Sequence, residues 1–166
     1  MPVGALNEGI QTLARDSVDA LMPLIMQRIY ESGPWTPAFG GAADGTITYG
    51  ASDQVGSYVR VGALVVAWCN FLFAATVTVA PSPVLLLRGL PFPARSTVNH
   101  RYGGYAHQFN IFNLTAGCID LTLRVLEGGT TANFMENFDN AGPQFLAGSA
   151  ISSGSFFSGA VIYETE

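Results

Sequence analysis

The run VGALVVAWCNFLFAATVTVA, residues 61–80, decides between two folds for this chain. No charged residue lies from Val61 to Leu87, and a run of twenty mostly apolar residues is long enough to cross a bilayer as a helix. Against a helix, Asn70 lies at the centre of the run, where a polar side chain is costly, and many of its residues are β-branched or aromatic. We therefore favour a long β-strand and keep a membrane-spanning helix as an alternative.

As a strand, this run separates two sets of side chains, because successive residues point to opposite faces. One face is wholly apolar, with Ala63, Val65, Ala67, Cys69, Phe71, Phe73, Ala75 and Val77. The other becomes polar toward its end, with Leu64, Val66, Trp68, Asn70, Leu72, Ala74, Thr76 and Thr78. We expect burial on both faces for much of the length, with a neighbouring subunit covering part of the strand.

The composition also predicts that part of the surface is covered by copies of the chain or by a partner. The chain has 166 residues and 17.5 kDa, which suits one domain with a small appendage. Charged residues make up 11%, against about 25% in ordinary soluble domains. A net charge of −5, with seven Arg and no Lys, argues against nucleic-acid binding through a basic patch.

Residues 1–33 are predicted to form a helical oligomerisation or docking segment, with the helix itself over 5–31. Pro23 interrupts the pattern and predicts a kink, and Ser32-Gly33-Pro34 predicts the end of the helix. Apolar residues recur at steps of three and four, which places them on one narrow stripe suited to packing against copies of itself. The stripe consists of Ile10, Ala14, Val18, Leu21, Ile25 and Ile29.

Residues 34–166 are predicted to form an antiparallel β-sandwich or jelly roll, so the chain as a whole is mainly β. Short runs of β-formers alternate with Gly, Pro, Asn and Ser, without a helical pattern between them. The expected strands are Thr46–Tyr49, Ser57–Val61, Leu64–Val79, Val84–Arg88, Thr97–Tyr102, Tyr105–Phe112, Cys118–Leu126, Asn133–Phe138 and Ser155–Glu164.

Four short motifs follow one another in this domain: PWTPAFGG at 34–41, GTITY at 45–49, GSYVRVG at 56–62 and GLPFP at 89–93. Their order resembles the β-domain near the C-termini of tailed-phage fibre and receptor-binding proteins. The resemblance spans residues 34–166 and implies a virion protein, usually a homotrimer about a three-fold axis with bundled helices. The short N-terminal segment fits a short spike, a capsid decoration or a tail-tip piece better than a long fibre, with capsid or tail proteins as partners.

Gly103-Gly104 is predicted to be a two-residue turn between alternating strands. Such a turn would set Tyr102 opposite Tyr105 and His100 opposite His107. Tyrosines beside histidines suit a surface that contacts glycan or a protein partner, since aromatic rings combine large area with a polar tip. The alternative is a hairpin that packs on a neighbouring subunit. The candidate binding residues are His100, Arg101, Tyr102, Tyr105 and His107.

No arrangement of residues predicts catalysis or a cofactor, and we expect that the chain is not an enzyme. Two facing histidines lack an evident third ligand, so no metal site is predicted. Cys69 and Cys118 fall inside apolar strands and are expected to be free thiols, with a disulfide between them as the alternative. Acceptor groups cluster at 136–140, in what we interpret as a solvated turn.

The leading hypothesis is therefore a homotrimeric structural protein of a phage virion that forms a short spike, a decoration or a tail-tip component. The first alternative is a receptor-binding module that recognises glycan on the host surface. The second alternative, from a different class, is a small membrane protein that spans the bilayer at 61–80.

Overall fold

The computed structural model describes residues 11, 15–23, 29–41, 46–78, 84–96 and 101–166. Residues 15–23 are helical, and the chain is otherwise mainly β. The strands are β1 Tyr30–Trp35, β2 Ala38–Gly41, β3 Thr46–Val61, β4 Leu64–Thr78, β5 Leu85–Arg88, β6 Tyr102–Phe112, β7 Cys118–Val125, β8 Thr131–Phe138, β9 Gln144–Phe145 and β10 Ile151–Glu164, and a 3-10 turn at Gly148–Ala150 precedes β10.

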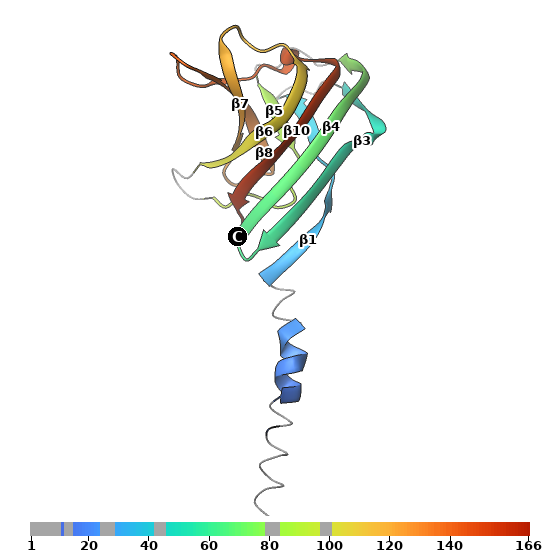
Figure 1. Cartoon of the computed structure of the whole chain (residues 1–166), viewed down its shortest axis with the longest axis vertical. Coiled ribbons are helices and arrows are strands. Elements are labelled where there is room, and N and C mark those ends of the chain that lie inside the picture. The colour runs from blue at the N-terminus through green and yellow to red at the C-terminus, as the bar shows by residue number, and fades with distance from the viewer. Residues whose placement is uncertain (1–10, 12–14, 24–28, 42–45, 79–83, 97–100) are drawn as a thin grey trace, which may run out of the picture.

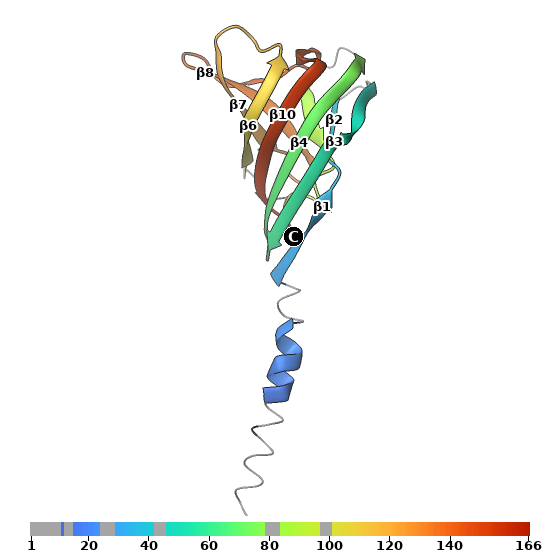
Figure 2. The same cartoon turned by 45° about the vertical axis from the view of Figure 1, so that its right-hand side comes forward.

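All of these strands belong to one antiparallel sheet, in the order β1-β3-β4-β10-β6-β7-β8-β5-β2, with β9 paired to β8. Figure 1 and Figure 2 show β3, β4, β10 and β6 side by side, with the helical residues below them. The predicted antiparallel β-domain is confirmed, whereas the predicted division into the two sheets of a sandwich is not.

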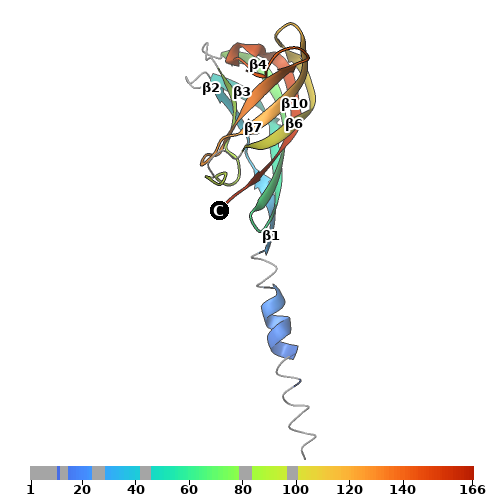
Figure 3. The ribbon, with the colours of Figure 1, turned by 90° about the vertical axis from the view of Figure 1, so that its left-hand side faces the viewer.

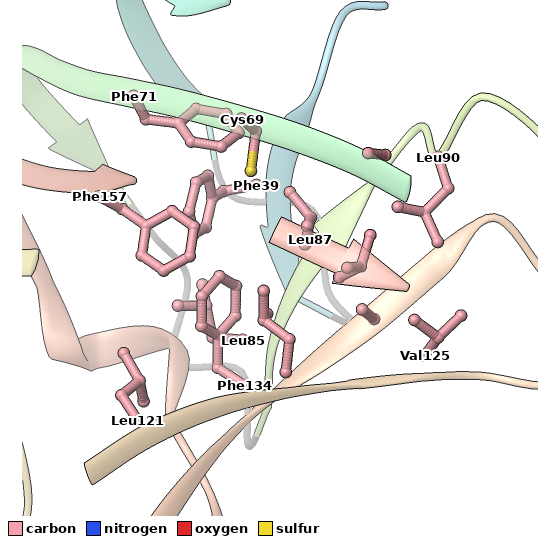
Figure 4. Packing of buried hydrophobic residues seen from close by; sticks show 14 of the residues in the cluster. Phe39, Cys69, Phe71, Leu85, Leu87, Leu90, Leu121, Val125, Phe134 and Phe157 are labelled. Carbon is pink, nitrogen blue, oxygen red and sulfur yellow. The ribbon is translucent and has the colours of Figure 1, made fainter. Parts of the chain in front are cut away.

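The sheet curls so that strands far apart in its order face each other across the core. Phe39 of β2 lies edge-on to Phe71 of β4, with the ring centroids 4.2 Å apart, and stacks on Phe134 of β8 at 5.1 Å. Phe157 of β10 meets Phe134 edge-on at 5.1 Å. These four rings converge between the two sides of the curl (Figure 4). Such aromatic pairs stabilise the fold beyond the area they bury, by about 1 kcal/mol each.

The alternation predicted for residues 64–72 is confirmed in β4, with one face buried and the other exposed. Val65, Ala67, Cys69 and Phe71 are at most 2% exposed, while Trp68 on the opposite face is 42% exposed. We call the side that faces the core the inner face and the other the outer face. Within a single chain, alternate residues from Leu64 to Leu72 are mostly exposed, so burial of this face by a neighbouring subunit stays a prediction.

The alternative of a membrane-spanning helix at 61–80 is wrong, because Val61 ends β3, residues 62 and 63 form a turn and β4 begins at Leu64. Among the described residues, no helix has both the length and the apolar character needed to cross a bilayer.

The helix predicted over 5–31 ends earlier, because Tyr30 begins β1, and Ser32-Gly33-Pro34 lie within that strand rather than at a helix end. Every residue of β1 pairs with β3, from Tyr30 opposite Val61 to Trp35 opposite Gly56, and these pairings override the local helical pattern. β1 thus crosses the predicted boundary between 33 and 34, and a separate N-terminal unit stays a prediction.

The apolar stripe predicted for oligomerisation is described only in part. Ile10, Ala14 and Ile25 lie outside the described residues. Val18, Leu21 and Ile29 are 55%, 54% and 45% exposed, so their side chains are available to a partner. The backbone carbonyl of Ile29 accepts a hydrogen bond from Gly62 N–H at 2.7 Å, which joins the start of β1 to the turn between β3 and β4. Figure 3 shows the helical residues extending away from the sheet.

Residues of the WTP and GSYVRVG motifs meet at the start of the sheet. The Trp35 indole N–H is shared between the carbonyls of Ser57 and Trp68, at 3.2 and 3.0 Å. Gly56 lies beside this indole, where an added Cβ would come within 2.5 Å of Nε1. Only glycine fits there without displacing the Trp35 ring, so these residues of the two motifs have a packing role.

The remaining motifs are also used for packing. Phe92 of GLPFP meets Tyr58 edge-on at 5.2 Å and lies under the Arg60 guanidinium, 4.8 Å from the ring centre. Its backbone N–H donates to the Tyr163 hydroxyl at 3.2 Å. Phe39 N–H donates to the hydroxyl of Tyr49, the last residue of GTITY, at 2.6 Å. The motifs that carry the family resemblance therefore stabilise the fold.

Candidate functional site

The turn predicted at Gly103-Gly104 is wrong, because β6 runs without interruption through both glycines. Each pairs on both sides, Gly103 with Ile162 and Arg124, and Gly104 with Val161 and Leu123. Glycine is required at 104 because the backbones of β6 and β10 approach closely there. An added Cβ at Gly104 would lie 2.3 Å from the Ala160 carbonyl oxygen.

A continuous strand separates the candidate binding residues instead of bringing them together at a tip. Tyr102 points inward and is 7% exposed, while Tyr105, three residues on, points outward and is 50% exposed. The predicted facing of these tyrosines across a turn is therefore wrong. Arg101 and His107 are exposed, and His100 lies outside the described residues. A binding role for these residues stays a prediction.

Tyr105 and His107 line a groove of about 300 Å³, which we call the aromatic groove. Its other side chains come from the outer faces of β4 and β10, the two strands that precede β6 in the sheet order. The complete lining is Trp68, Asn70, Tyr105, His107, Ser158, Gly159 and Ala160. The groove therefore joins three segments of the sequence, with 35 positions from Asn70 to Tyr105 and 51 from His107 to Ser158.

A β-bulge shapes the β6 side of this groove. Ser158 pairs with Gln108, but the next residue, Gly159, pairs with Ala106, so His107 is the extra residue in the ladder. Gly159 leaves no room for a side chain, since an added Cβ would lie 2.7 Å from the Tyr105 carbonyl and 2.5 Å from the Phe157 ring. The bulge and the glycine together bring the two strands close beneath the groove.

The aromatic groove offers two exposed rings and a set of uncharged polar groups. Trp68 and Tyr105 lie on either side of Ala160, which pairs directly with both. Rings of this kind supply large apolar area at little entropic cost, and the amide of Asn70 and the hydroxyl of Ser158 can donate and accept hydrogen bonds. This combination suits a sugar ring, which has an apolar face and polar edges.

Sequence reasoning missed Trp68, Asn70 and Ser158 as members of this site. The available signal was the alternation of residues 64–72, which puts Trp68 and Asn70 on the face opposite the core. The sequence predicts burial of that face for much of its length, and nothing local in the sequence relates it to Tyr105.

Buried titratable groups lie on the inner side of the sheet. Burial raises the pKa of the Cys69 thiol to about 12, and it raises the pKa of Tyr163 to about 12 as well. Both cysteines are free thiols in the structure, Cys69 buried and Cys118 partly exposed, so the alternative of a disulfide is wrong.

The interpretation of 136–140 as a solvated turn is also wrong for its first half, because residues 136–138 belong to β8. Glu136 is 2% exposed, and its carboxylate accepts hydrogen bonds from the backbone N–H and the hydroxyl of Thr115, the latter at 2.8 Å. This carboxylate fixes the loop after β6.

Beside the aromatic groove, the outer sides of β1, β3, β4 and β10 carry large apolar side chains, which we call the apolar face. Tyr30 pairs with Val61, and Val61 with Leu64, so these three form one row across the strands. At the rim, Glu164 lies opposite Leu64 and forms an ion pair with Arg95 at 3.7 Å. Each member is between 43% and 54% exposed: Tyr30, Val55, Val61, Leu64, Leu72 and Ile162.

Comparison with known proteins finds a likeness to a solved structure. No family model matches the chain, and no curated protein matches it. The Dettilon tailspike protein matches in fold with a TM-score of 0.64 at 18% sequence identity. The match covers 81% of this chain and 24% of the tailspike, so the chain spans about a quarter of that protein's length. At this identity, the likeness shows a shared fold.

Proposed function

We propose that this chain is a structural protein of a phage virion that assembles as a homotrimer into a short spike, a decoration or a tail-tip component. The fold shared with part of a tailspike supports this proposal. The single observation that carries it is the apolar face, because exposed residues this large, gathered on one side of a sheet, mark an interaction surface.

A trimer accounts for this surface and for the helical residues together. A short isolated helix is marginally stable in water, so residues 15–23 need a partner to hold their form. Val18 and Leu21 supply apolar contacts for a helical bundle, and the apolar face supplies contacts between β-domains. A closed ring of identical subunits buries both surfaces and leaves neither free.

Two measurements test this proposal. Light scattering on the purified chain should give three times the 17.5 kDa of one chain. Electron microscopy of intact phage particles, labelled with gold through an antibody against the chain, should place the label on the virion at a fixed position. A monomer in dilute buffer would contradict the trimer, and unlabelled particles would contradict the virion role.

The second candidate function is recognition of glycan on the host surface through the aromatic groove, by binding without catalysis. The observation that favours it is the position of Trp68 and Tyr105 on either side of Ala160, with Asn70, His107 and Ser158 beside them. Grooves of this size that combine aromatic rings with a few polar groups are typical of sites for small ligands.

Adsorption of particles to host cells tests this candidate. Tyr105→Ala removes one ring and should lower adsorption about tenfold with particles intact, because stacking on an aromatic ring contributes about 1 kcal/mol or more. Tyr105→Phe retains the ring and is the matched control. Equal adsorption by Tyr105→Ala and wild-type particles would limit Tyr105 to a structural role.

A further inference from the structure

We propose that a cationic groove on the outer side of β6, β7, β8 and β9 binds a carboxylate or phosphate group of an anionic saccharide. This inference rests on the second proposed function, because it specifies that the glycan bound in the aromatic groove is anionic. The residues that would bind its charged group lie outside the aromatic groove.

Two arginines lie together on this part of the outer face. Arg124 lies opposite Gly103. Arg101 directly precedes β6, two residues before that glycine, and lines the same cavity as Arg124. Gly103 has no side chain to separate them. Both arginines line a cavity of about 460 Å³ together with Thr122, Asn137 and other residues, and both line a neighbouring cavity of about 310 Å³. We call this region the cationic groove.

Within the described part of the chain, the guanidinium group of neither arginine forms a hydrogen bond or an ion pair. Arg60, in contrast, pairs with Glu31, and Arg95 with Glu164. Glu127 lines the smaller cavity but forms no ion pair with either arginine within the described ranges. Two guanidinium groups that line one cavity carry like charges and repel each other, and an anionic ligand relieves that repulsion. Guanidinium is also the side-chain group that binds carboxylate and phosphate through paired hydrogen bonds.

The groove offers more than charge, which favours a saccharide over a free anion. The Asn137 amide donates to the Thr122 hydroxyl at 3.0 Å, and this pair lies in the cavity wall with polar capacity for a sugar hydroxyl. Phe145 of β9 lines the same cavity and is 46% exposed, so it presents a ring against which a sugar can pack.

The two grooves lie along one row of directly paired residues. From the aromatic groove, Trp68 pairs with Ala160, and Ala160 with Tyr105. Tyr105 pairs with Thr122 of the cationic groove, and the row continues across β8 to β9 through Met135 and Phe145. Neighbouring strands lie about 4.8 Å apart, so Tyr105 and Phe145 are roughly 14 Å apart across the strands. A chain of a few sugars spans that distance and reaches both grooves.

Calorimetry with matched charged and neutral sugars tests the inference. The first pair is tetragalacturonate and its complete methyl ester, and the second is glucose 6-phosphate and glucose. The wild-type protein should bind the charged member of at least one pair about tenfold more tightly, as expected for a charge-assisted contact. Arg124→Gln and Arg101→Gln should each remove most of that preference. Increasing salt should weaken binding of the charged sugar and leave the neutral one unchanged.

Arg95→Gln removes the same charge elsewhere on the surface and should leave the preference unchanged. Loss of the preference in Arg95→Gln as well would indicate a general charge effect and overturn the cationic groove. Equal binding of both members of each pair, abolished by Trp68→Ala, would overturn the cationic groove and leave glycan recognition standing. No binding of any of these sugars would overturn the cationic groove, and adsorption of Tyr105→Ala particles then decides glycan recognition separately.

Discussion

The outer face of the sheet has two halves that differ in chemistry although they share one backbone scaffold. Over β1, β3, β4 and the end of β10, exposed residues such as Val61, Leu64 and Ile162 form the apolar face. Over β6, β7 and β8, the exposed and partly exposed groups include Tyr105, His107 and Arg124. The inner face is apolar beneath both halves. The core therefore sets the fold, and the outer face carries the two surfaces that we propose for assembly and for recognition.

The largest expected effect is on the oligomeric state, and it tests whether the apolar half of the outer face lies in the trimer interface. Ile162→Glu places a charge in the apolar face and should reduce the mass measured by light scattering from a trimer to a single chain, because burying an unpaired carboxylate is costly. Ile119→Glu is the matched control, since Ile119 is 68% exposed on β7, outside the apolar face. A trimer that persists in Ile162→Glu would remove this half from the interface.

The next effect concerns the junction of β6 and β10, which joins the two halves. Gly104→Ala should lower the free energy of unfolding by about 2–3 kcal/mol, because its Cβ would collide with the backbone at Ala160. Gly103→Ala is the control, since its Cβ would meet only the Leu123 carbonyl at 3.9 Å. Urea denaturation measures both variants. Equal free energies of unfolding for the two variants would mean that β6 and β10 can move apart at Gly104 without a loss of stability.

A smaller effect is expected at Trp68, which lies between the apolar face and the β6 half of the outer face. It tests whether Trp68 contributes to saccharide binding or to assembly. Trp68→Ala should lower the affinity of the aromatic groove for its saccharide by about tenfold. The mass of the trimer should stay unchanged. Trp68→Phe retains a ring and should recover most of the affinity. Calorimetry and light scattering on the same samples compare the two roles. If the mass measured by light scattering falls while the saccharide affinity is unchanged, Trp68 belongs to the apolar face.

The smallest effect comes from the inner side, beneath the apolar face. The folded pKa of Cys69 is raised to about 12 from an ordinary 9.0, so the unfolded chain loses this proton first as the pH rises. Its contribution to stability is complete below pH 9 and declines between pH 9 and about 12. Cys69→Ala should make the dependence of unfolding free energy on pH shallower by about one proton in that range, as measured by denaturation. An unchanged pH dependence of the unfolding free energy in Cys69→Ala would contradict a raised pKa for this thiol in the folded chain.

Residue patterns were sufficient to predict the strands whose alternation is regular. In β7, Leu121, Leu123 and Val125 point to the core as expected. Ile119 belongs to the same alternation but is exposed, because a register shift between Cys118 and Asp120 changes the pairing at the start of the strand. A single shift of this kind leaves no signal in the alternation itself.

The remaining errors arise from pairings between distant segments. Gly103-Gly104 has the composition of a turn, but contact with Ala160 of β10 accounts for glycine at 104. The candidate site has the same origin, since β10 must pair with both β4 and β6 before Trp68 and Tyr105 can share a groove. The local sequence pattern was sufficient to select Tyr105 and His107 as candidate binding residues. Their neighbours in the groove follow only from the order of the strands in the sheet.

The edge strand β1 has a consequence for how copies of the chain add to one another. β1 ends one side of the sheet order, and it contains Pro34, which has no amide hydrogen to donate. Glu31, on the same strand, adds a negative charge beside the arginine it pairs with. Both features discourage a second molecule from extending the ladder sideways, which is the route to amyloid-like fibres. The exposed edge of the sheet is thereby protected against open-ended pairing with other strands.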